Sequence, residues 1–202
     1  MLVQSGTVNL SLVKAFYANL NHSHSSSFSN HLWVRGKNIV VTPDIWSHFL
    51  EIGRPEYSMY PLESMAEGIP NIHFDIVASF LTKQPYEWLS GILPYSLPEY
   101  RLLNLIVCHN IEPLGHHMDI THERGYVFYA IANGLHVDLP TFMVLQMCNI
   151  AGSTRTVGMP FGVLLTQFLE THSVPTYPDD TYVKVCKKLN TQTVHQSEAH
   201  MP

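Results

Sequence analysis

The fold is decided by the stretch from Leu97 to Val174, which reads LPEYRLLNLIVCHNIEPLGHHMDITHERGYVFYAIANGLHVDLPTFMVLQMCNIAGSTRTVGMPFGVLLTQFLETHSV. It contains four apolar segments of helical length, separated by short polar, glycine-containing or proline-containing connections. Such segments are typical of amphipathic or buried helices. Because the connections are short, we expect consecutive helices of this stretch to pack against one another.

The residues ahead of the four segments predict where each helix begins. Aspartate is a favoured N-cap and proline a favoured first-turn residue. The expected starts are Pro98, Asp119, Asp138 and Pro160. The first segment is apolar on almost every side over residues 101–109, which favours burial on several sides. Gly134 is the expected end of the second helix.

Further helices and a hairpin are predicted ahead of this stretch. Apolar side chains recur with a helical period over residues 10–20. Two β-rich runs flank a glycine turn, which predicts a small β-hairpin near residues 32–41. Residues 42–44, Thr-Pro-Asp, are typical of a helix start, and that helix should end near residue 53. Another helix is expected over residues 71–82.

The predicted fold class is therefore mainly α: a helical bundle-like domain with one small β-hairpin near residues 32–41. We expect a single domain over residues 1–174. Residues 175–202 are interpreted as a polar C-terminal tail, partly disordered, with a short helix over residues 182–189.

The composition favours a protein partner over nucleic acid. Charged residues make up 13% of the 202 residues, about half of the usual share of ~25%. A surface this poor in charge favours burial against another protein or self-association. The formal net charge of −5 lacks the basic excess that phosphate-backbone binding requires, so nucleic acid is only an alternative partner.

The cysteines and the apolar runs indicate the cellular compartment of the protein. Cys108, Cys148 and Cys186 are widely spaced and odd in number, which favours a reduced, intracellular protein over a disulfide framework. No run approaches the roughly 20 apolar residues of a membrane-spanning helix, and the first 20 residues lack the apolar core of a secretion signal. The sequence does not distinguish cytoplasm from nucleus.

A histidine-rich shoulder precedes the second helix of the central stretch. The weak candidates for metal ligands there are His109, His116, His117 and His122. Zinc requires three or four ligands that converge tetrahedrally. The zincin pattern H-E-x-x-H fails, because Tyr126 stands where the second histidine should be. We therefore predict no metal or other cofactor and interpret these residues as helix-capping or surface histidines.

No catalytic constellation is found in the sequence. The acidic residues mostly occupy positions where helix caps are wanted, and the G-x-S-x-G nucleophile pattern is absent. Arg35 and Lys37, at the predicted hairpin turn, are weak candidates for phosphate contacts. A solvated turn is the favoured interpretation of both side chains.

Several segments resemble a known family. They are residues 12–20 (LVKAFYANL), residues 34–37 (VRGK), the block from Leu114 to Gly134 with Pro113 ahead of it, residues 161–166 (FGVLLT) and residues 172–174 (HSV). Together they span roughly residues 10–174 and resemble the plant family described as "putative plant transposon protein". The resemblance implies a protein derived from a plant mobile element and supplies no catalytic residues.

These observations predict a non-enzymatic interaction or assembly domain of a plant mobile-element-derived protein. The first alternative is a gag-like, nucleic-acid-associated protein, and the second is a metal-dependent enzyme. A protein partner or self-association is the expected mode of action, with no membrane involvement.

Overall fold

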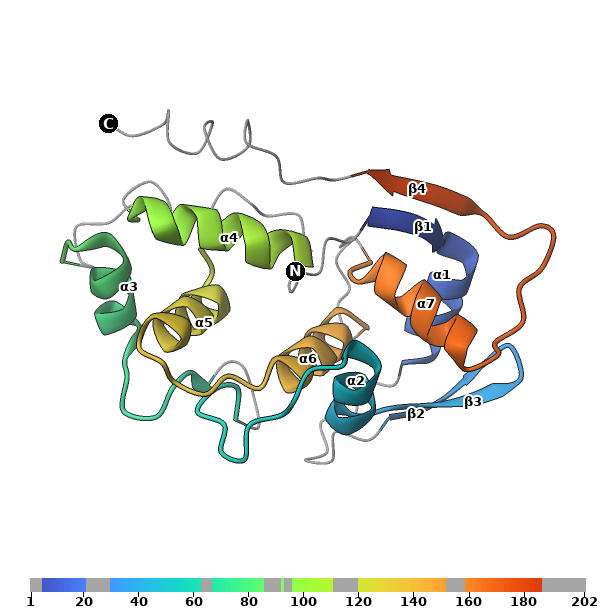
Figure 1. The fold of residues 1–202 in the computed structure, drawn as a ribbon, viewed down its shortest axis with the longest axis horizontal. Coiled ribbons are helices and arrows are strands. Elements are labelled where there is room, and N and C mark those ends of the chain that lie inside the picture. Colours follow the sequence, from blue (N-terminus) through green and yellow to red (C-terminus); the bar gives the residue numbers. More distant parts are fainter. Residues whose placement is uncertain are drawn as a thin grey trace.

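The computed structural model describes residues 5–20, 30–62, 67–85, 92, 96–110, 120–151 and 159–186. Seven α-helices and two small antiparallel two-stranded sheets make up this part of the chain (Figure 1). The predicted fold class, mainly α with a small hairpin, is confirmed.

The two ends of the described chain meet in one sheet. Strand β1 (Ser5–Asn9) runs directly into helix α1 (Leu10–Asn19), where the Asn9 side chain accepts a hydrogen bond from the Leu12 amide at 2.9 Å. Strand β4 (Tyr182–Cys186) pairs antiparallel with β1, so that Asn9 lies opposite Tyr182. The helix predicted over residues 10–20 is confirmed.

The helix predicted over residues 182–189 is wrong for residues 182–186. The segment Tyr-Val-Lys-Val-Cys alternates β-branched and polar side chains, and pairing with β1 stabilises it as a strand. Residues 187–202, where part of the predicted disorder falls, lie outside the described residues. The division at residue 174 stays a prediction, although strand pairing attaches residues 182–186 to β1.

The predicted hairpin near residues 32–41 is confirmed as strands β2 (Asn30–Val34) and β3 (Lys37–Val41). Arg35 and Gly36 form the turn with φ values of 47° and 78°. Helix α2 (Pro43–Leu50) follows, capped by the Thr42 side chain as expected. It ends slightly earlier than predicted, because Glu51 turns to a left-handed conformation.

A second group of helices comprises α3 (Phe74–Thr82), α4 (Pro98–Asn110) and α5 (His122–Ala132). The expected cap Asp119 lies outside the described residues, and the cap of α5 is Thr121, which accepts a hydrogen bond from the Arg124 amide at 3.4 Å. Gly134, with φ +66°, follows α5 in a left-handed turn as predicted.

Helix α6 (Leu139–Ala151) begins as predicted after Asp138, which accepts a hydrogen bond from the Thr141 amide at 3.1 Å. Helix α7 (Gly162–Thr171) follows Phe161, whose backbone is left-handed. Pro160 stands one residue before that cap and does not itself begin the helix.

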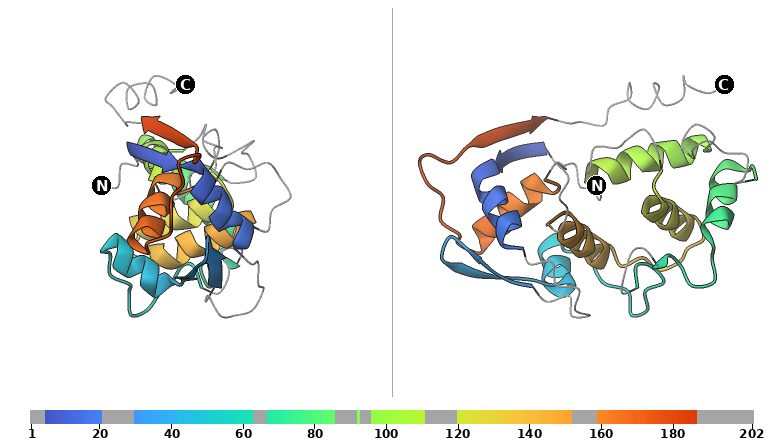
Figure 2. Two further views of the ribbon diagram at one scale, coloured as in Figure 1. Left: turned by 90° about the vertical axis from the view of Figure 1, so that its right-hand side faces the viewer. Right: turned by 180° about the vertical axis from the view of Figure 1, so that it is seen from behind.

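Two hydrophobic cores share helix α6. The first joins α1, the hairpin, α2 and α7, and the second joins α3, α4 and α5. Met143, Val144 and Met147 of α6 belong to the first core, whereas Phe142 belongs to the second. In Figures 1 and 2, α6 accordingly lies between the two groups of elements.

The expectation that the four central helices pack consecutively holds for α4 and α5 but is wrong for α7, whose main contacts are with β1 and α1. Helix α6 likewise contacts α2 most extensively. The reason is that the N-terminal third of the chain supplies apolar surfaces that compete for these helices. In the described part of the chain, no helix combines the length and apolar character needed to cross a membrane. An intracellular location stays a prediction.

Candidate functional site

The histidine-rich shoulder is only partly described. His122 is the first residue of α5, is exposed, and stacks its ring against Phe74 with centroids 3.7 Å apart. His116 and His117 lie outside the described residues, and only the backbone of His109 is described, within α4. Among the residues that the structure describes, no group of three or more His, Cys, Asp or Glu side chains is arranged to hold a metal ion.

Arg35 is not the solvated turn residue that the sequence suggests. Its guanidinium donates two hydrogen bonds to Asp180, at 2.8 and 2.6 Å, and one to the Pro175 carbonyl at 3.0 Å. It also lies over the Tyr177 ring, 4.6 Å from its centroid. Only 13% of the Arg35 side chain is exposed, so its charge is used within the protein. Lys37 is exposed on the same hairpin, as expected.

Asp180 connects three segments through one carboxylate. Besides Arg35, it accepts hydrogen bonds from the Asn9 side chain at 2.8 Å and the Tyr177 amide at 3.0 Å. We call Asn9, Arg35, Tyr177 and Asp180 the terminal clasp. The hydrogen bond from Arg35, reinforced by those from Asn9 and Tyr177, holds the pKa of the Asp180 carboxyl well below its ordinary value. The clasp thereby fixes the segment before β4 to the hairpin and to β1.

Replacement of Asp180 by asparagine tests the clasp through its pH dependence. A carboxyl with a lowered pKa in the folded state stabilises the fold fully above its unfolded pKa of about 3.9, and this contribution is lost as the pH falls toward the folded value. We therefore expect the urea midpoint of the wild type to fall more steeply than that of Asp180→Asn between pH 5 and pH 2. Parallel pH profiles of the two proteins would contradict the role of the clasp.

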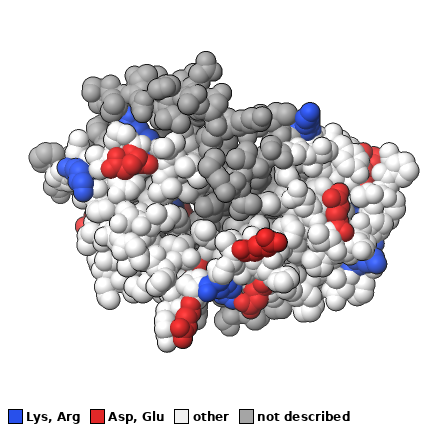
Figure 3. Space-filling view, viewed as in Figure 1, with Lys and Arg blue, Asp and Glu red and all other residues white. Residues whose placement is uncertain are grey.

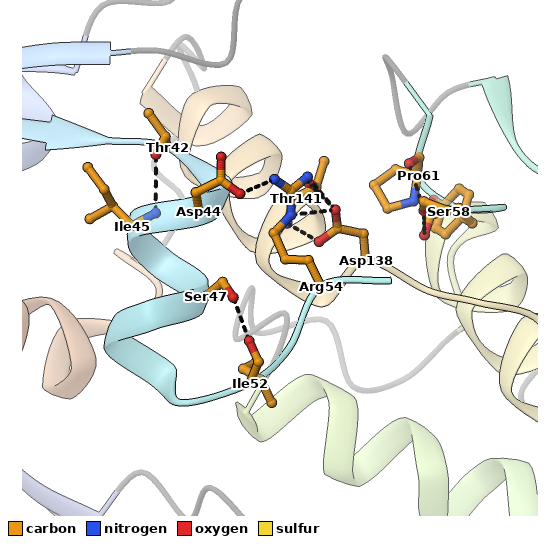
Figure 4. Close-up of polar contacts among 11 residues, drawn as sticks. Thr42, Asp44, Ile45, Ser47, Ile52, Arg54, Ser58, Pro61, Asp138 and Thr141 are labelled. Atoms are coloured by element: carbon orange, nitrogen blue, oxygen red, sulfur yellow. Dashed lines mark hydrogen bonds and ion pairs between the residues drawn. The ribbon is translucent and has the colours of Figure 1, made fainter. Parts of the chain in front are cut away.

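A second polar cluster joins α2 to α6 (Figure 4). Arg54 donates to the Asp138 carboxylate from Nε at 2.9 Å and from Nη2 at 2.6 Å, and it pairs with Asp44 of α2 through Nη1. The Thr141 hydroxyl lies within 3.2 Å of Arg54. The hydrogen bonds to Asp138 raise the pKa of the Arg54 guanidinium. The bonds from Arg54 to Asp138 and Asp44 connect the residues after α2 to the N-terminus of α6 and so position that end of the helix.

A hollow with a volume of about 580 Å³ lies between α2 and α7. We call it the α2–α7 groove. Its lining residues are Asp44, Ile45, His48, Phe49, Phe168, Thr171 and His172. Phe49 and Phe168 contact each other and the buried Trp46, with ring centroids 5.0 to 5.3 Å apart. The groove thus has an aromatic wall held by the first core, and no local sequence motif indicates it.

Together these features define a mainly α-helical domain with two cores, in which the ion pairs Arg35–Asp180 and Arg54–Asp138 join segments far apart in the chain. The chain belongs to the family described as "Putative plant retrotransposon-related domain", whose model matches residues 1–175. The resemblance noted in the sequence is thereby confirmed, and the protein is mobile-element-derived. No curated protein and no solved structure matches the chain.

Proposed function

We propose that this mobile-element-derived domain is a non-enzymatic protein-interaction module that binds a segment of a partner protein in the α2–α7 groove. The observation that carries this proposal is the aromatic wall of the groove, where the half-buried Phe49 of α2 rests on the fully buried Phe168 of α7. Its partner would be a peptide segment that inserts a bulky apolar side chain against the accessible parts of Ile45 and Phe49. Peptide-binding grooves commonly use this combination of apolar pocket and helix surfaces.

The groove has the arrangement expected of a binding site. Its aromatic wall rests on Trp46, which is fully buried in the first core, so the pocket is supported without a partner. His48 and Thr171 stand exposed at its rim and offer polar groups to the backbone of a bound segment. An apolar centre with a polar rim is the usual anatomy of protein interfaces.

The nucleic-acid alternative has less support in the described residues. Arg35 and Arg54 are paired with carboxylates, and the Arg124 residue is only 1% exposed. On the face shown in Figure 3, the described surface is mostly uncharged, and its few acidic and basic side chains are scattered over it. Binding to a phosphate backbone needs several accessible Lys or Arg side chains on one face of the protein. The metal-dependent enzyme remains an alternative that zinc analysis of the untagged, purified chain can test.

A peptide-display selection against the full chain tests the proposal. We expect enriched peptides to share a bulky apolar residue. Thr171→Arg and His48→Glu, which alter the groove rim, should weaken binding by about tenfold or more. Gln167→Arg is the matched control, because Gln167 is exposed on α7 but does not line the groove. Enrichment of no motif, or equal loss in all three variants, would overturn the proposal.

A further inference from the structure

Strand β4 offers an open edge among the described residues. It pairs only with β1 in a two-stranded sheet, and Figure 1 shows it on the outer side of β1. The Leu10 amide donates to the Thr181 carbonyl at 2.8 Å, so Thr181 and Val183 direct their backbone groups toward β1. The N–H and C=O groups of Tyr182 and Lys184 therefore point away from β1. Such groups can pair with another strand.

The backbone of β1 supports this assignment of which β4 groups point away from β1. Asn9, the cross-strand neighbour of Tyr182, donates its amide to the Thr166 hydroxyl of α7 at 3.0 Å instead of to β4. The side chains along the open edge are also accessible, since Tyr182 is 50% and Val183 is 45% exposed. The edge therefore combines outward backbone groups with accessible side chains.

The charges around β4 are arranged for antiparallel pairing with an identical strand. Asp179 precedes β4 and is exposed, whereas Lys184 lies within it. Antiparallel self-pairing directs the Lys184 end of each described strand toward the Asp179 end of the other, which is favourable for two copies.

We propose that two copies of this chain associate through β4, with Val183 of each copy opposite Val183 of the other across a two-fold axis. The result is a continuous four-stranded antiparallel sheet in the order β1–β4–β4–β1. This inference deepens the proposed function by naming a second copy as one partner, and it uses a surface other than the groove. A two-fold axis makes the contact self-complementary and closed.

The register follows from the backbone and the charges. Pairing about Val183 places the outward groups of Tyr182 opposite those of Lys184, where they exchange hydrogen bonds. A register centred on Lys184 would instead oppose two ammonium groups. A register centred on Tyr182 would need the Asp180 amide, which already donates to the Tyr177 carbonyl at 3.1 Å. Val183 is therefore the centre of the pair.

Light scattering of the full chain tests the association. At about 100 µM we expect twice the mass of a single chain for the wild type. Lys184→Pro should give the mass of one chain with an unchanged circular dichroism spectrum, because its amide points away from β1 and proline is tolerated at such edge positions. A wild-type chain of single mass, or a dimer that Lys184→Pro leaves intact, would overturn the inference.

Disulfide trapping tests the register independently of the proline variant. In a Cys186→Ser background, Val183→Cys should form a disulfide-linked dimer under mild oxidation, because directly opposed non-hydrogen-bonded residues lie about 4.5 Å apart at Cα. Tyr182→Cys and Lys184→Cys should cross-link much less, and the Cys186→Ser parent serves as the background. Equal cross-linking of all three would overturn the Val183 register. Since the groove variants test peptide binding, failure here is distinguishable from failure of the proposed function.

Discussion

Phe168→Ala is expected to lower the free energy of unfolding by about 3–5 kcal/mol, the usual range for removal of a buried phenylalanine. Phe168 is fully buried and its ring contacts Trp46 at 5.0 Å and Phe49 at 5.2 Å between centroids. The substitution removes both contacts and leaves a cavity in the first core. Urea unfolding monitored by circular dichroism measures the loss.

Gln167→Ala is the matched control for this prediction, because Gln167 is the exposed neighbour of Phe168 on α7. Surface substitutions of this kind usually change stability by less than about 0.5 kcal/mol. Phe168→Ala should also reduce peptide binding, since its ring supports Phe49, whose accessible part lines the α2–α7 groove. A Phe168→Ala protein as stable as the control would contradict the description of the first core.

Gly68→Ala is expected to cost about 2–4 kcal/mol, from a left-handed backbone and from overpacking. Gly68 has φ +69°, and an added Cβ would lie 2.4 Å from Cζ of Tyr126. The Tyr126 ring has little freedom to withdraw, since its hydroxyl donates to the Ile72 carbonyl at 3.1 Å and its ring packs on Tyr60 and Phe74. The same urea titration measures this effect in the second core.

Gly134→Ala separates the cost of the left-handed backbone from the cost of overpacking. Gly134 has nearly the same backbone, φ +66°, but an added Cβ would meet nothing within 4 Å. This control should cost about 1 kcal/mol from its backbone alone. If both variants lost the same stability, the contact between Gly68 and Tyr126 would not be the source of the larger effect.

The elements predicted correctly depend on interactions between residues close in sequence. The hairpin follows from two β-rich runs and a glycine turn. Helix α2 follows from the cap at Thr42, whose hydroxyl accepts a hydrogen bond from the Ile45 amide only three residues away. The Asp138 cap is equally local, because it contacts Thr141. Local chemistry of this kind is visible in the sequence without knowledge of the fold.

The features that sequence reasoning missed depend on partners far apart in the chain. The sequence around Arg35 indicates a solvated side chain, because its partner Asp180 lies 145 residues away. Residues 182–186 carry a weak local signal, and it is pairing with β1 that makes them a strand. The α2–α7 groove similarly needs two helices whose proximity no short motif records.

Helix α6 shows why packing was harder to predict than secondary structure. Its apolar side chains divide between two cores, with Phe142 in one and its neighbour Met143 in the other. A helix that is apolar on several sides indicates burial, but it does not indicate which elements cover each side. Helices α6 and α7 therefore pack on the N-terminal elements of the chain instead of consecutively on one another.

The most direct test of the proposed protein-interaction role is a competition titration of the full chain with a fluorescent peptide from the display selection. Unlabelled peptide and single-stranded RNA are added separately at low salt, where phosphate binding is strongest. We predict that unlabelled peptide displaces the probe and that RNA neither displaces it nor binds. Binding of RNA with a steep salt dependence, without measurable binding of any selected peptide, would contradict it.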